Sequence, residues 1–110
     1  MNQNNIYAML GMAMKSGNVV RSEFACENAV KSMKAHLVIV PTDASFNTKK
    51  LFSNKTTFYR VPYVEFGTKD ELGHAIGKAM RSSIALTDEG FAKAIITKME
   101  KIQKDITEEN

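Results

Sequence analysis

Four consecutive aliphatic residues, Leu-Val-Ile-Val, stand at positions 37–40 of the chain. Three of them are β-branched and the run is too short for a buried helix, so it predicts a β-strand over residues 37–41. A strand that is apolar on both faces must be covered on both faces, as the central strands of α/β sheets are. Pro41 cannot donate a hydrogen bond to a neighbouring strand, so the strand should end there. The polar loop that follows is where α/β folds tend to place ligands.

Apolar residues recur every three or four positions in five other segments, which predicts five helices. The third is expected to run from Ser45 to about Lys55, and the fourth to turn Ala79 inward together with Leu72 and Ile76. Residues 16–18 (Ser-Gly-Asn) should end the first helix, because Gly and Asn tolerate a left-handed conformation. The residues expected to cap the five starts are Asn4 or Asn5, Ser22, Ser45, Thr68 (in a capping box with Glu71) and Asp88.

Shorter apolar runs at residues 19–20, 61–66 and 84–86 predict three further strands, which alternate with the helices. This alternation predicts an α/β fold: a three-layer α/β/α sandwich with a central mixed sheet of about four strands. The length of 110 residues predicts a single domain over residues 1–110, with a frayed tail at residues 107–110.

The net charge of +3 is unevenly distributed along the chain. Residues 1–87 hold 11 Lys and Arg against 6 Asp and Glu, whereas residues 88–110 hold 4 against 6. The basic excess therefore belongs to the body of the fold, which permits an acidic partner such as nucleic acid. The chain has no apolar run of membrane-spanning length, no secretory pattern at its start, and one cysteine. We therefore expect a cytoplasmic protein without a membrane segment or an internal disulfide.

Catalysis finds little support in the residue pattern. His36 and His74 are isolated, so no metal-ligand spacing exists, and no phosphate-binding glycine loop occurs. Cys26 has no histidine near it in the sequence and is interpreted as a core thiol rather than a nucleophile. We predict a protein that is not an enzyme, with no catalytic residue, no metal and no cofactor.

The order of the elements, with residues 35–40 (Ala-His-Leu-Val-Ile-Val) and 43–45 (Asp-Ala-Ser), resembles the ribosomal protein 7Ae/30e superfamily. Residues 61–63 (Val-Pro-Tyr) and 72–78 (Leu-Gly-His-Ala-Ile-Gly-Lys) match the same family. Residues 45–48, 77–81 and 87–92 are most similar to its YlxQ-type bacterial members. The resemblance covers about residues 6–98. Members of this family are small α/β/α proteins that bind kink-turns in RNA, so the resemblance implies a non-catalytic, ribosome-associated protein that binds rRNA or another structured RNA. For a chain of this size, a monomer is the simplest expectation.

The resemblance also implies that loops 15–28, 42–45 and 78–83 converge at one edge and bind RNA. The residues themselves support such a site, because a helix that begins at Ser22 and Glu23 presents unpaired N–H groups and a positive dipole end to phosphate. Arg81 is the first candidate, since it follows a helix end and has little structural reason to be there. The predicted RNA-binding residues are Lys15, Arg21, Ser22, Glu23, Phe24, Asn28, Asp43, Lys78 and Arg81.

Several of these residues have a structural interpretation beside the functional one. Asp43 is expected either to accept a hydrogen bond from a base or to cap the third helix together with Ser45. Glu23 would accept from guanine amino groups or favour the helix dipole, and Phe24 would stack on a base or form a half-buried staple. Gly73 and Gly77 indicate either close approach to a ligand or close packing and a helix stop.

One segment departs from the family pattern. The kink-turn signature, Gly-x-Asn/Lys-Glu/Gln-x-x-Lys, aligns with residues 22–28, where Phe24 and Ala25 replace the polar residues and Asn28 replaces the lysine. Either the protein recognises RNA through a different set of residues, such as Arg21, Glu23 and Asn28, or its affinity for kink-turns is reduced. The alternative function is accordingly a protein-interaction adaptor that keeps the fold with weakened or lost kink-turn recognition. A small-ligand or enzymatic module is a third, weaker hypothesis.

Overall fold

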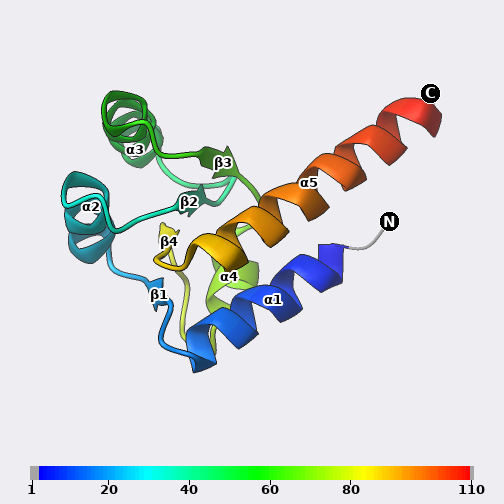
Figure 1. Cartoon of the computed structure of the whole chain (residues 1–110), viewed down its shortest axis with the longest axis horizontal. Helices are drawn as coiled ribbons and strands as arrows, with labels where there is room; N and C mark the ends of the chain where they lie inside the picture. The colour runs from blue at the N-terminus through cyan, green and yellow to red at the C-terminus, as the bar shows by residue number, and fades with distance from the viewer. Residues whose placement is uncertain (1–2, 110) are drawn as a thin grey trace.

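The computed structural model describes residues 3–109, with side chains described for residues 3–104. Helices and strands alternate without exception along this part of the chain, in the predicted order (Figure 1). The elements are α1 (Gln3–Lys15), β1 (Val19–Val20), α2 (Glu23–Lys31), β2 (Leu37–Val40), α3 (Phe46–Tyr59), β3 (Tyr63–Glu65), α4 (Lys69–Ala75), β4 (Ile84–Leu86) and α5 (Glu89–Glu109).

The four strands of the described chain form one mixed sheet in the order β1-β4-β2-β3. Strand β2 runs parallel to β3, with Ile39 beside Val64, and antiparallel to β4, with Ile39 beside Ile84. Strand β4 is also antiparallel to β1. Strands β1, β2 and β3 therefore point the same way, and their carboxyl ends share one edge of the sheet with the amino end of β4. The predicted mixed sheet is confirmed.

Helices cover both faces of the sheet, so the three-layer prediction is also confirmed. Figure 1 shows α2 and α3 on one side, and α1, α4 and α5 on the other. Alternate residues of β2 contribute to two cores. Leu37 and Ile39 pack in the core beneath α1, α4 and α5, whereas Val38 and Val40 pack in the core beneath α2 and α3. All four side chains are fully buried. Strand β2 is thus the central, doubly covered strand that its sequence predicts.

The predicted caps are present at four of the five helix starts. Ser22 Oγ accepts from the Ala25 N–H at 3.0 Å, Ser45 Oγ from the Thr48 N–H at 3.1 Å, and Asp88 from the Phe91 N–H at 2.8 Å. Thr68 and Glu71 complete the capping box of α4. The prediction for α1 is wrong, because the helix already includes Gln3 and so contains both asparagines instead of starting after one of them. No residue that would break a helix precedes them within the described chain, so nothing stops α1 there.

Two helices end elsewhere than predicted. Helix α3 continues past Lys55 to Tyr59, because its last turns still pack on the core through the buried Thr56. The Thr56 hydroxyl, which is shielded from water, donates to the Phe52 carbonyl at 2.6 Å. Helix α4 ends at Ala75, so Ala79 lies outside it and is exposed, contrary to prediction. The reason is Gly77, whose φ of 72° lies in the left-handed region that stops a helix.

Helix α5 bears the predicted apolar stripe. Ile95 is fully buried, and Phe91, Met99 and Ile102 pack against the same core, while the side chain of Ile106 lies outside the described residues. The helix continues to Glu109, and Asn110 is not described. Among residues 3–109, neither α5 nor a shorter helix combines the length and hydropathy that crossing a membrane requires.

Candidate nucleic-acid interface

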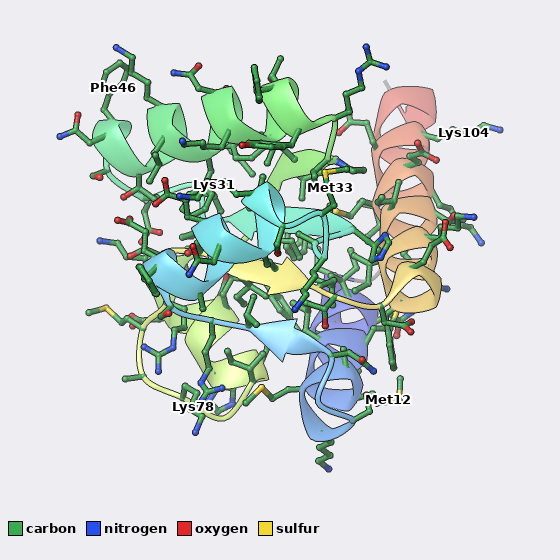
Figure 2. The ribbon with its side chains drawn as sticks, turned by 60° about the vertical axis from the view of Figure 1, so that its left-hand side comes forward. Met12, Lys31, Met33, Phe46, Lys78 and Lys104 are labelled. Carbon is green, nitrogen blue, oxygen red and sulfur yellow. The ribbon has the colours of Figure 1, made fainter. Side chains whose placement is uncertain are left out.

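Four segments with polar residues gather at the sheet edge where β1, β2 and β3 end and β4 begins. We call this surface the rim and define it as residues 21–24, 41–46, 66–69 and 77–83. Helices α2, α3 and α4 all start there. Figure 2 shows Phe46 and Lys78 on this side, on the left, and Met33, beyond the far end of α2, toward the right.

Two hydrogen bonds hold segments of the rim together. One joins a carboxylate to a backbone N–H, and the other joins two backbone groups. Asp43 Oδ1 accepts from the Lys69 N–H at 2.9 Å, and the Lys69 carbonyl accepts from the Arg81 N–H at 3.2 Å. Asp43 therefore satisfies the first N–H of α4, not of α3 as expected, and the capping interpretation for α3 is wrong. Asp43 caps α4 because the fold brings Lys69, which is 26 residues further along the chain, next to it. The β2–α3 loop and the α4–β4 loop are thereby joined through one residue.

A hollow of about 410 Å³ opens at the start of α2. Arg21, Ser22 and Arg81 line it, together with Val19, Val20 and Ala25. Three of the predicted site residues, from segments about 60 positions apart, thus share one cavity. The free N–H groups of the first turn of α2 and two guanidinium groups give this hollow the electrostatics that favour an anion.

Arg81, which lines this hollow, has an unsatisfied polar atom. Its Nε is buried and has no hydrogen-bond partner, and its Nη1 makes only a long contact of 3.5 Å with the Met80 carbonyl. A buried donor without a partner costs roughly 1–3 kcal/mol. Because the Arg81 guanidinium forms no ion pair within the described chain, its charge is left for a phosphate or a base edge.

Lys78 lies in a neighbouring hollow of about 470 Å³, which Asp70, His74 and Met80 also line. In the described chain, none of Lys78, Arg21 and Arg81 forms an ion pair. The rim acids Asp43 and Glu23 are instead engaged in hydrogen bonds within the protein. The cations of the rim are thus left for a partner, whereas these two carboxylates serve the fold.

The start of α2 presents the remaining predicted residues. Glu23 Oε2 accepts from the Thr48 hydroxyl at 3.3 Å, which ties α2 to α3, a role that neither sequence interpretation included. Phe24 is 75% exposed, so the half-buried staple is wrong and a free aromatic face remains. Asn28 lies one turn further along α2, is exposed, and shares the face of Phe24.

Lys15 is a predicted residue that the fold places at the other edge of the sheet. It ends α1 ahead of β1, at the sheet edge opposite the rim. The Asn18 carbonyl, three residues later, accepts from the Thr87 N–H just after β4, which marks that opposite edge. Because β1 separates Lys15 from Arg21, the two cations do not lie in the same site.

Sequence reasoning missed two large apolar residues on the rim. Phe46, the first residue of α3, is 74% exposed, and Met80 in the α4–β4 loop is 60% exposed. Phe46 lies outside the buried stripe formed by Phe52 and Thr56, and this mismatch in helical period is a signal that could have identified it.

Cys26 is fully buried beneath the hollow, and its thiol contacts the Val20 carbonyl at 3.4 Å. Burial raises the pKa of the thiol to about 11. At pH 8 the thiolate population is then on the order of a hundredfold below that of an exposed cysteine. We expect a disulfide reagent such as DTNB to react with the native protein far more slowly than with protein in guanidinium chloride, as followed by absorbance. Equally fast reaction in both would contradict the interpretation of Cys26 as a core thiol.

Among residues 3–104, the side chains of His, Cys, Asp and Glu form no group of three that could hold a metal ion. The groups that the rim offers to a partner are cationic side chains, exposed aromatic side chains and helix N-termini.

Solved structures share this architecture. A protein of unknown function from Bacillus halodurans superposes with a TM-score of 0.82 at 32% identity, over 84% of this chain and 93% of that one. A Giardia lamblia 15.5 kD RNA-binding protein superposes with a TM-score of 0.78 over 92% of each chain. Its 21% identity supports the common fold alone.

Sequence comparisons agree with the fold. The RNA-binding protein YlxQ of Bacillus subtilis (strain 168) is 36% identical over 83% of this chain and 91% of its own length. The protein of that name in Enterococcus faecium is 35% identical over 84% of this chain and 88% of its own. These matches agree with the prediction that the chain is not an enzyme. A family profile covers residues 4–96, and the chain therefore belongs to the ribosomal protein L7Ae/L30e/S12e/Gadd45 family.

Proposed function

We propose that this protein is a non-catalytic, cytoplasmic RNA-binding protein that recognises a kink-turn, or a similarly bent RNA, with the rim. One observation carries the proposal: Arg21 and Arg81 line a common hollow at the start of α2, and neither guanidinium forms an ion pair within the described chain. Membership in the family and the RNA-binding relatives support it. We expect the target to be ribosomal or another structured RNA, and the protein to bind it as a monomer.

The rim offers two kinds of contact to such an RNA. The start of α2 with its two arginines suits a phosphate, because backbone N–H groups and guanidinium forks both donate to phosphate oxygens. The exposed rings of Phe24 and Phe46 suit bases that a kinked RNA splays out of its helix, since stacking needs a free aromatic face. A straight duplex offers phosphates but keeps its bases stacked.

This difference defines the mechanism. Because the protein binds the bent RNA more tightly than the open RNA, it shifts the RNA population toward the bent form. The equilibrium between the two forms shifts by at most the ratio of the two affinities. Phe24, Ala25 and Asn28 replace the polar residues and the lysine of the family signature. We therefore propose that cation and stacking contacts contribute more of the discrimination here, and contacts to G·A base edges less.

A gel-shift titration with three RNAs tests the proposal. The probes are a kink-turn RNA, the same RNA with its G·A pairs disrupted, and a straight duplex of equal length. We expect the kink-turn to bind most tightly and all binding to weaken as salt rises, because phosphate contacts release counterions. Equal affinity for all three RNAs would overturn recognition of the bent form.

The second candidate is a protein-interaction adaptor that has lost kink-turn recognition. The exposed Phe24 favours it, because an apolar ring stands where the family signature has a polar residue. No RNA binding even at low salt would favour this adaptor over the first proposal.

A further inference from the structure

Four helices of the described chain end in the same motif. A residue with positive φ follows the helix, and the N–H of the next residue bonds back to a carbonyl five positions earlier. The bonds run from Asn18 to Ala13, Lys34 to Ala29, Val61 to Thr56 and Lys78 to Gly73, at 2.8–2.9 Å.

Glycine occupies the positive-φ position in only two of these motifs. Gly17 ends α1 and Gly77 ends α4, but Met33 ends α2 with a φ of 62° and Arg60 ends α3 with a φ of 60°. A side chain in the left-handed region destabilises the fold, which is why glycine is favoured there. Among the described residues, Met33 and Arg60 are the only non-glycine residues with positive φ. Their side chains thus carry a stability penalty that glycine would remove.

Both residues line the same pocket, which has a volume of about 260 Å³. The side chain of Met33 is 62% exposed at its margin. Residues that precede β2, follow α3 and begin α5 complete the walls. The apolar walls are formed by Ala35, Val61, Pro62, Ala92 and Ile96.

The charge at the margin of this pocket is positive. Glu89 is engaged by Lys93, with 3.3 Å between Oε2 and Nζ. Arg60 is exposed and makes no ion pair or side-chain hydrogen bond within the part of the chain that is described. Its planar fork is suited to a carboxylate. An apolar cavity with one free guanidinium at its margin is complementary to an aliphatic side chain next to an acid.

We propose that this pocket docks a linear acidic segment of a protein partner, which inserts one aliphatic side chain and pairs a neighbouring carboxylate with Arg60. The volume is below the roughly 300–1,000 Å³ of typical small-molecule sites, and it is large enough to admit a side chain. An RNA backbone would meet Arg60 but leave the apolar walls unfilled. Met33 and Arg60 occupy positions where glycine would be more stable. Such local backbone strain often accompanies binding sites.

The pocket and the rim lie at opposite edges of the sheet. Ala35 and His36 enter β2 at the pocket, whereas Pro41 leaves β2 at the rim. Figure 2 shows the same separation between Met33 and Phe46. A peptide in the pocket therefore leaves the rim free for RNA, and the two proposals stand or fall separately.

Selection from a random hexapeptide library displayed on phage, with the full chain as bait, tests the proposal. We expect enriched peptides to share one aliphatic residue beside Asp or Glu. The dominant peptide, labelled with fluorescein, is then titrated by fluorescence anisotropy against wild type and variants. We expect Arg60→Gly to weaken its binding about tenfold, because a charge-assisted hydrogen bond is lost, and to raise the Tm by about 2–4 °C, because the left-handed strain is relieved.

Lys50→Ala is the matched control, since it removes one exposed cation from α3, the helix that Arg60 follows, and leaves the pocket intact. We expect this variant to bind the peptide within about twofold of wild type, as is usual for an exposed charge outside an interface. Enrichment without the acidic and aliphatic pattern, or equal affinity for wild type and Arg60→Gly, would overturn the proposal. Competition between kink-turn RNA and the peptide would also overturn it, because the pocket would then belong to the RNA surface.

Discussion

Replacing Gly73 with alanine is expected to lower the free energy of unfolding by about 2–3 kcal/mol, the range of an overpacked core. A methyl group there would overlap the carbonyl oxygen of Ala79 and lie 2.6 Å from its carbonyl carbon and 3.1 Å from the Cα of Met80. These atoms are backbone, so they cannot rotate away as a side chain would. The measurement is chemical denaturation followed by circular dichroism.

The sign of this effect is the test. Gly73 is helical, and helix propensity alone predicts that alanine would stabilise α4 by about 1 kcal/mol. Gly77→Ala is the control, because no atom lies within 4 Å of the added methyl and only its positive φ opposes the change. We expect that control to cost about 1 kcal/mol. Unchanged or increased stability of Gly73→Ala would mean that the α4–β4 loop does not pack against the helix as described.

The two glycines thereby receive the structural interpretations. Gly73 permits close packing of the α4–β4 loop, and Gly77 stops the helix. Their effect on the rim is indirect, because they position the loop that carries Lys78 and Arg81. Gly73→Ala should therefore weaken RNA binding as well as stability.

Arg81→Met is expected to lower the affinity for the kink-turn RNA about tenfold or more, because a charged donor contributes roughly 1.5–3 kcal/mol to a hydrogen bond. Methionine keeps much of the aliphatic contact of arginine but has no donor. The Tm should remain unchanged or rise slightly, since the substitution also removes the buried Nε that has no partner. Gel-shift titration and thermal denaturation of the same preparation measure the two effects.

Lys15→Met is the matched control for charge, because it removes one cation at the opposite edge of the sheet. We expect it to bind RNA nearly as wild type does. A loss of folding in Arg81→Met would show that the arginine is structural. Equal weakening by both variants would mean that RNA responds to net charge and not to the hollow at the start of α2.

Patterns confined to one segment were sufficient for most of the architecture. The β-branched run of β2 predicted a doubly covered strand, and the Thr68–Glu71 capping box marked the start of α4. Such features depend on neighbours within about four positions, so they can be recognised before the fold is known. The same locality explains the error at α1, where two asparagines could act as caps but the helix already includes Gln3 and so contains both of them.

Only the tertiary structure determines which distant segments of the chain come into contact. Asp43 caps α4 rather than α3 because β3 brings Lys69 beside it, and Lys15 is separated from Arg21 because the direction of β1 places them at opposite edges. The pocket of Met33 and Arg60 likewise joins the ends of two helices. Residue order along the chain predicts which groups are available, whereas strand direction and packing decide which of them meet. These pairings lie beyond the reach of any local pattern, because their free energy arises from segments that are close only in the folded state.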